Sequence, residues 1–294
     1  MRDLKMGLIA LGLLASATHA IAQRTVHTER SMYRNIIIND ESGTRCMKFS
    51  RSETAGRQSC QVLRDPRRLV FPYTKMMLGA LYLDPQPHRI LVLGLGGGTL
   101  PSALAALPAT STVDVVEIDP AITRVAQKYF GLRLDGPIHV HEEDGRVFVK
   151  RALKAGARYD LVMLDAFDHE YIPEHLLTRE FLTEVKGLLG EHGVLAANTF
   201  SNSRLYDYES ATYQAVFGEF FNLRSDNRVI LVRMGGLPSR EVLERNAAAV
   251  DRRLAEWGVD RAWLLSLFAT KPDWRADARV LTDQYSPSNL LNVQ

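Results

Sequence analysis

Acidic side chains follow three predicted strands at the points where those strands end. Glu117, Asp144 and Asp165 each lie at or just after an apolar run that is typical of a buried strand, and Asp168 lies three residues beyond Asp165. The carboxyl ends of parallel strands meet at one edge of an open sheet, where ligands bind. We therefore expect these carboxylates to gather at one site that suits a cationic substrate or proton transfer.

Each carboxylate has more than one interpretation. Asp165 at a buried strand end should have a raised pKa, which suits a base that accepts a proton from an amine, although it could instead cap a helix or bond within a loop. Asp168 could bind a cationic substrate or be solvated. Asp144 precedes a predicted helix, so it could be an N-cap, a ligand group or both.

A glycine turn precedes the first of these carboxylates. The apolar run 90–93 ends in a turn that contains Gly94, Gly96 and Gly98, and a helical pattern follows. Glycines permit a tight turn and close approach of a ligand to the backbone, and the helix N-terminus favours negative charge. Glu117 lies about 20 residues beyond the turn, where an acid can accept both ribose hydroxyls. The pattern predicts a nucleoside site rather than a simple tight connection.

The surrounding elements have the order of a parallel α/β sheet, because strands and helices alternate from residue 90. Strands are predicted at 90–93, 112–118, 137–141, 159–164 and 193–199, helices at about 100–107, 120–129, 145–154, 178–189 and 208–219, and a final hairpin at 220–225 and 228–234. We expect a Rossmann-like sheet domain over residues 89–235.

Two smaller units flank this domain. Residues 23–88 read as β-hairpins, which break at Asp65-Pro66, followed by a helix that carries Tyr73. Tyr73 could be a core residue or could reach over the carboxyl edge of the sheet. Residues 236–294 read as a helical extension, whose tail carries Asp283 and Tyr285 within possible reach of the site.

The N-terminal segment has the features of a secretory signal peptide. Arg2 and Lys5 precede an apolar run over 6–15, and the segment 1–22 ends in Ala-Ile-Ala. The run is short for a membrane span, so we expect cleavage before Gln23 rather than an uncleaved anchor. The mature protein would then be periplasmic or secreted, without a membrane segment.

Export favours a disulfide between the two cysteines, Cys46 and Cys60, over two buried thiols. We expect no metal site, because the cysteines lack histidines at ligand spacing and because His169 and His175 read as loop residues. The formal net charge of +2 argues against a nucleic-acid partner.

Together these motifs resemble the spermidine synthase (polyamine aminopropyltransferase) family over roughly residues 31–234. The matching motifs are the glycine turn, Glu117-Ile-Asp119, Asp144-Gly145 and Asp165-Ala-Phe-Asp168. The stretches 172–181 and 281–287 resemble a branch of spermidine synthase-like proteins that is often exported. The resemblance implies a methyltransferase-type, seven-stranded, mostly parallel sheet with an N-terminal β domain, and a homodimer.

The resemblance also implies an activity. The family transfers an aminopropyl group from decarboxylated S-adenosylmethionine, a co-substrate rather than a permanently bound cofactor, to a diamine, and it releases methylthioadenosine. By motif, Glu117 would hold the ribose, Asp144 and Gly145 would lie at the adenine, Asp165 would be the catalytic base, and Tyr73 and Asp168 would hold the amine.

One residue departs from the family pattern. The glycine motif usually contains an Asp that binds the aminopropyl nitrogen, and Gly97 occupies that position here. Two alternatives therefore stay open. One is an S-adenosylmethionine-dependent methyltransferase, whose donor has a carboxylate that an Asp would repel. The other is a non-catalytic protein that binds a polyamine or nucleoside.

Overall fold

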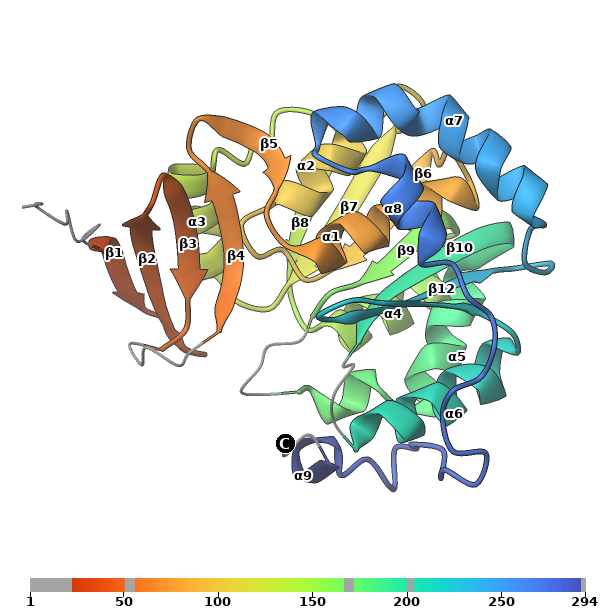
Figure 1. Ribbon diagram of the computed structural model, residues 1–294. Helices are drawn as coiled ribbons and strands as arrows, with labels where there is room; N and C mark the ends of the chain where they lie inside the picture. The colour runs from red at the N-terminus through yellow and green to blue at the C-terminus, as the bar shows by residue number, and fades with distance from the viewer. Residues whose placement is uncertain (1–22, 51–55, 167–171, 200–203, 292–294) are drawn as a thin grey trace, which may run out of the picture.

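A computed structural model describes residues 23–50, 56–166, 172–199 and 204–291, which form two sheets and their covering helices (Figure 1). The first sheet is antiparallel and has the order β1-β2-β3-β4-β5. Its strands are β1 (Arg24–Arg30), β2 (Asn35–Glu41), β3 (Thr44–Lys48), β4 (Arg57–Val62) and β5 (Asp65–Leu69), and it is followed by helix α1 (Pro72–Met77) and the 3₁₀ helix η1 (Leu78–Tyr82).

The second sheet has seven strands in the order β11-β12-β10-β9-β6-β7-β8. Its strands are β6 (Arg89–Leu93), β7 (Thr112–Glu117), β8 (Ile138–Glu142), β9 (Tyr159–Leu164), β10 (Leu189–Thr199), β11 (Phe221–Arg224) and β12 (Arg228–Arg233). Strands β6 to β10 run parallel, whereas β12 pairs antiparallel with β10 and with β11. The predicted seven-stranded, mostly parallel Rossmann-like fold is confirmed.

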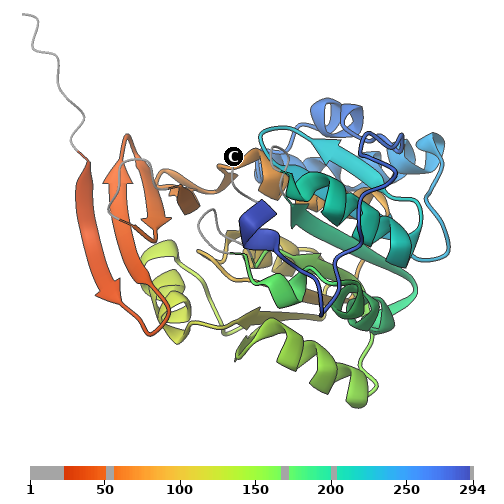
Figure 2. The ribbon, with the colours of Figure 1, turned by 90° about the horizontal axis from the view of Figure 1, so that it is seen from below.

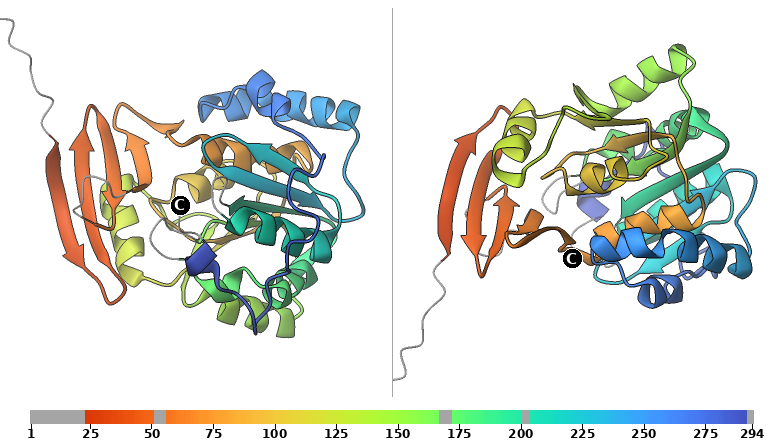
Figure 3. Two further views of the ribbon diagram at one scale, coloured as in Figure 1. Left: turned by 60° about the horizontal axis from the view of Figure 1, so that its bottom comes forward. Right: turned by 90° about the horizontal axis from the view of Figure 1, so that it is seen from above.

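Helices cover both faces of this sheet (Figures 1 and 3). The helices after η1 are α2 (Thr99–Ala105), α3 (Pro120–Phe130), α4 (Gly145–Lys154), η2 (Glu174–Leu176), α5 (Arg179–Leu188), α6 (Leu205–Phe217), α7 (Arg240–Glu256), α8 (Arg261–Ser266) and α9 (Ser288–Leu291). Ile90 and Val92 of β6 pack with α1, α2, α7 and α8, whereas Leu91 and Leu93 pack with α4, α5 and α6. Strand β6 is therefore apolar throughout because both of its faces are buried.

The five-stranded sheet packs beside α3 and shares the core of the larger domain (Figures 1 and 2). Arg45 Nη1 donates to the carbonyl of Tyr129 at 3.0 Å, and Gln61 Nε2 donates to the carbonyl of Phe130 at 2.9 Å. These contacts hold β3 and β4 against the end of α3. Strand β4 is thereby fixed above the carboxyl edge of the seven-stranded sheet.

The two outer strands of the small sheet differ from the sequence-based expectation. The break predicted at Asp65-Pro66 is wrong, because β5 begins there. Proline is tolerated at an edge strand since its missing N–H need not face a partner. Strand β1 was not predicted, because its exposed edge position leaves a polar sequence without apolar alternation.

Cys46 of β3 and Cys60 of β4 are paired in register and form a disulfide with an S–S distance of 2.01 Å. The predicted disulfide is therefore present in the structure. Across the described ranges, no helix is long and apolar enough to cross a membrane.

Candidate active site

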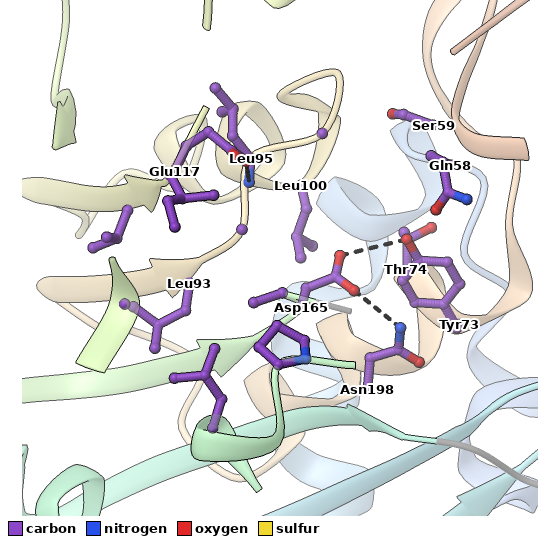
Figure 4. A pocket seen from close by; sticks show the side chains of 18 of the residues that line it. Gln58, Ser59, Tyr73, Thr74, Leu93, Leu95, Leu100, Glu117, Asp165 and Asn198 are labelled. Carbon is purple, nitrogen blue, oxygen red and sulfur yellow. Dashed lines mark hydrogen bonds between the residues drawn. The ribbon is translucent and has the colours of Figure 1, made fainter. Parts of the chain in front are cut away.

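A cavity of about 380 Å³ opens at the carboxyl edge of β6, β7, β9 and β10. The glycine turn and Asp165 lie at its floor, while β4 and α1 form the opposite wall (Figure 4). The cavity therefore lies between the two sheets, where an open α/β sheet places its ligands.

The glycine turn brings two strand ends into close contact. Gly94 donates its N–H to the carbonyl of Val116 at 2.8 Å, and Asp165 donates its N–H to the carbonyl of Leu93, also at 2.8 Å. A Cβ on Gly94 would lie 2.1 Å from the carbonyl oxygen of Asp165, and its φ is +99°. Only glycine permits this approach. Gly94 and Gly96 line the cavity, whereas Gly98 is the N-cap of α2 and is not among the lining residues.

Glu117 projects from the end of β7 into the same cavity. Its carboxylate accepts hydrogen bonds from the N–H of Leu95 at 3.2 Å and the N–H of Asp119 at 3.0 Å. Burial raises the pKa of Glu117, while these N–H groups and the charge of Arg34 oppose the rise. The carboxylate is thus fixed beside the glycine turn, in a position to accept hydroxyl donors.

Asp144 caps α4, since its Oδ1 accepts from the N–H groups of Arg146 and Val147. Its other oxygen lies 2.9 Å from His175 Nε2. Burial acts to raise the pKa of Asp144, but the hydrogen bonds from Val147 and His175 outweigh it and the pKa is lowered. Asp144 and Gly145 both line the cavity, so capping does not exclude ligand contact.

Asp165 follows β9 and is held by two donors from other elements. Asn198 Nδ2 on β10 donates to Oδ1 at 3.0 Å, and the Tyr73 hydroxyl on α1 donates to Oδ2 at 3.4 Å (Figure 4). Burial raises the pKa of Asp165 from its ordinary value of 3.8 to about 7, although both hydrogen bonds lower it. A carboxyl with this pKa can exchange a proton at neutral pH, as a general base requires.

Gly97 has no space for a side chain. Its N–H donates to Ser59 Oγ at 3.0 Å, and a Cβ would lie 2.7 Å from that oxygen and 2.9 Å from the ring of Phe130. Real Cβ atoms do not approach so closely, so an Asp at this position would require β4 or Phe130 to move. The hydroxyl of Ser59 therefore stands where a residue-97 side chain would point.

Sequence reasoning missed three residues that line the cavity. Asn198 lies at the carboxyl end of the fifth predicted strand, where the same edge rule could have found it. No sequence pattern pointed to Ser59, because its hydrogen-bond partner Gly97 is 38 residues away. His175 was read as a loop residue, yet it contacts Asp144. The proposed amine-binding residue Asp168 lies outside the described residues.

The site combines a glycine turn beside one carboxylate with a second carboxyl whose pKa lies near neutrality. This arrangement is typical of a transferase that binds a nucleoside. Residues 70–233 match the sequence profile of the spermine/spermidine synthase domain. The chain is 45% identical to a polyamine aminopropyltransferase of Vibrio vulnificus over 97% of both chains. The chain therefore belongs to the spermine/spermidine synthase family, which is a family of aminopropyltransferase enzymes.

Solved structures add the fold and a second activity class. Spermidine synthase from Thermotoga maritima aligns with a TM-score of 0.62 and 17% identity, covering 84% of this chain and 85% of that one, and shows the shared fold. Human methyltransferase-like protein 13 in complex with SAH aligns with a TM-score of 0.57 and 26% identity, covering 73% of this chain and all of that one.

Proposed function

We propose that this protein transfers an aminopropyl group from decarboxylated S-adenosylmethionine to a diamine. The observation that carries the proposal is Asp165, a carboxyl with a pKa of about 7 at the floor of the cavity, between the glycine turn and Tyr73. Its near-neutral pKa suits it to take a proton from an amine, and family membership supports the choice of reaction.

In the proposed reaction the amine nitrogen attacks the carbon next to the sulfonium sulfur. A C–N bond forms, the C–S bond breaks, and its electron pair returns to sulfur, so neutral methylthioadenosine leaves. The proton released by the amine goes to Asp165. Positioning of the two substrates would supply most of the rate, and general-base help would contribute about 10²–10⁴-fold.

The remaining residues would orient the substrates. Glu117 would accept the ribose hydroxyls, and Asp144 with Gly145 would lie at the adenine. The phenol of Tyr73 donates to Asp165 and would border the amine. Asp168 would hold the far amine by charge. No resident metal or cofactor has a part in this scheme.

A second candidate is methyl transfer from S-adenosylmethionine. Two observations favour it: the structural likeness to a methyltransferase in complex with SAH, and the closed position at Gly97, which has no carboxylate of its own to attract an aminopropyl ammonium group. The third possibility is binding without catalysis, in which the cavity would hold a polyamine or nucleoside unchanged.

Mass spectrometry of products separates the three. The mature chain from Gln23 is incubated with either donor and a mixture of diamines. Methylthioadenosine with an aminopropylated amine, absent in Asp165→Asn, supports the proposal. S-Adenosylhomocysteine supports methyl transfer. A lack of product from either donor, together with a thermal shift from methylthioadenosine or a polyamine, would favour a binding protein.

We also propose that the protein is exported after removal of residues 1–22, as a member of the exported branch of the family, and that it is periplasmic or secreted. The signal-like composition and the Cys46–Cys60 disulfide support this proposal. N-terminal sequencing from a periplasmic or culture fraction should give Gln23 first, and recovery of full-length protein from the cytoplasm would contradict it.

The resemblance further supports a homodimer, for which light scattering of the mature chain at catalytic concentration is the measurement. A mass near that of one chain would refute the dimer without affecting the proposed chemistry.

A further inference from the structure

One wall of the cavity is formed by Pro173, His175 and Leu176, which lie on or next to η2. Asp144 lines the same part of the cavity, and its carboxylate lies 2.9 Å from His175 Nε2. The placement of η2 therefore sets the shape of the cavity at the end assigned to the adenine. The contacts that hold η2 lie outside the cavity itself.

Asn289 of α9 holds the residue at the start of this wall from both sides. Its Oδ1 accepts from the N–H of Ile172 at 3.0 Å, and its Nδ2 donates to the carbonyl of Ile172 at 3.1 Å. The same Nδ2 and the backbone N–H of Asn289 both donate to Glu174 Oε1, each at 3.1 Å. One amide thus satisfies a backbone donor and acceptor 117 residues away in the sequence, as a neighbouring strand would.

A second contact fixes the other end of the wall. Asp283 accepts from the hydroxyl of Thr178 at 2.7 Å and from the guanidinium of Arg146 at 2.7 and 2.8 Å. Arg146 also forms two hydrogen bonds to Glu184 of α5. The hydrogen bonds from Arg146 lower the pKa of Asp283 to about 2. Since the N–H of Arg146 donates to the capping Asp144, the tail is linked to Asp144 as well as to η2.

Apolar packing joins the two contacts. Leu281 is fully buried with Ile172, Leu177 and Leu205, in a small cluster separate from the two main cores. Figures 1 and 2 show α9, in dark blue, beside α6. Neither Asp283 nor Tyr285 lines the cavity, so the tail acts on the site through η2 rather than by direct contact.

We propose that the tail over residues 281–291 is a positioning element of the nucleoside pocket, and that Asn289 is its principal positioning residue. The tail holds Ile172 and Glu174 in place and thereby fixes Pro173, His175 and Leu176 beside Asp144, where the adenine is proposed to bind. This inference rests on the proposed function only in taking the ligand of this end of the cavity to be an adenosine derivative.

The test compares Asn289→Ala with Leu290→Ala in the mature chain. Leu290 is the neighbouring residue on α9 and is 76% exposed, so its truncation reports only the general effect of changing this helix. Methylthioadenosine affinity is measured by calorimetry, and hydrogen exchange follows the backbone amides of 172–178. We expect about a 10-fold loss of affinity and faster exchange in Asn289→Ala alone.

Steady-state kinetics should separate Asn289→Ala from Leu290→Ala in the same way. The KM for the nucleoside donor should rise by a similar factor in Asn289→Ala, while kcat and the pH dependence set by Asp165 change little, because β9 is not held by the tail. A structural defect without a positioning role would lower the unfolding free energy but leave the nucleoside KM of the folded fraction unchanged.

A second substitution at Glu174 should restore part of the affinity that a charged residue at position 289 removes. Asn289→Asp places a second carboxylate against Glu174 and should weaken binding more than Asn289→Ala, whereas adding Glu174→Gln provides a donor for that carboxylate and should recover part of the affinity. Equal affinity and exchange in Asn289→Ala and Leu290→Ala would overturn the inference. If the wild-type chain binds methylthioadenosine but shows no turnover with any donor, the result would count against the proposed function alone. A wild-type chain that does not bind methylthioadenosine would refute both.

Discussion

Replacing Asp165 with asparagine should abolish turnover and, at neutral and higher pH, should make the folded protein more stable. The carboxyl of Asp165 has a pKa raised from 3.8 to about 7 by burial, so the folded state resists its ionisation. An amide has the same shape and no charge. Its oxygen can accept from Asn198 and its NH₂ group can donate to the oxygen of Tyr73, so both present partners are retained.

The size of the effect follows from the two pKa values. A difference of about three pKa units at about 1.4 kcal/mol per unit gives at most about 4 kcal/mol. Between these pKa values the folded state binds more protons than the unfolded state, so the wild-type free energy of unfolding falls as pH rises from about 4 to about 7. The penalty is absent below the unfolded pKa and complete above the folded pKa. Asp165→Asn lacks it at every pH.

Urea unfolding at several pH values tests this directly. The stability difference between Asp165→Asn and wild type should grow by about 2–3 kcal/mol between pH 5 and pH 8. Glu219→Gln, which removes an exposed carboxylate, serves as the control for loss of one negative charge. Aminopropyl transfer by wild type should fall below about pH 7, since a protonated Asp165 cannot accept a proton.

A stability difference that does not change with pH, or a variant less stable than wild type at pH 8, would refute the reasoning about the buried carboxyl. Substitution of Asn198 by alanine gives an independent check. The hydrogen bond from Asn198 lowers the pKa of Asp165, so its removal should move the acid limb of the rate profile to higher pH. A shift toward lower pH would contradict the assigned contact.

Three further changes test other parts of the site. Gly97→Ala should lower the free energy of unfolding by about 1–3 kcal/mol, and Ser59→Gly in the same chain should recover part of this loss. If urea unfolding shows no loss of stability in Gly97→Ala, β4 moves away from residue 97 without a measurable energetic cost. Cys46→Ser with Cys60→Ser removes a disulfide whose cysteines are 14 residues apart and should cost about 3 kcal/mol in non-reducing buffer, with wild type in reductant as the comparison. Glu117→Gln should weaken methylthioadenosine binding about 10- to 100-fold by calorimetry, and unaltered affinity would place the ribose elsewhere.

The sequence was most informative where both faces of an element are buried. The apolar run that forms β6, the glycine turn after it and the carboxylates after β7 and β9 predicted the sheet and one edge of the cavity. The edge strands β1 and β5 were not predicted, because an exposed edge needs neither apolar alternation nor a full set of N–H donors.

Side chains that meet across the fold were harder to predict. The strand-end rule could place Asn198 at the carboxyl edge, but its contact with Asp165 becomes predictable only once β10 is known to lie next to β9. The contact of Ser59 becomes predictable only once β4 is known to pack against the glycine turn. The pairing of Asn289 with Ile172 depends on the path of the last residues, for which no local pattern exists. Periodicity predicts which face of an element is buried, but it does not predict which element lies against that face.

The sequence positions of the cavity residues determine at which point of its synthesis the protein can first bind a nucleoside. Its lining residues run from Tyr33 to Asn227, and its floor joins β6 to β9 and β10 through contacts between distant parts of the sequence. A growing chain that ends after the small sheet and the glycine turn contains about half of the residues that line the cavity, and it lacks the base Asp165. Chain segments that end before β12 should therefore fail to retain nucleoside, and nucleoside retention can report that a newly made molecule has finished folding.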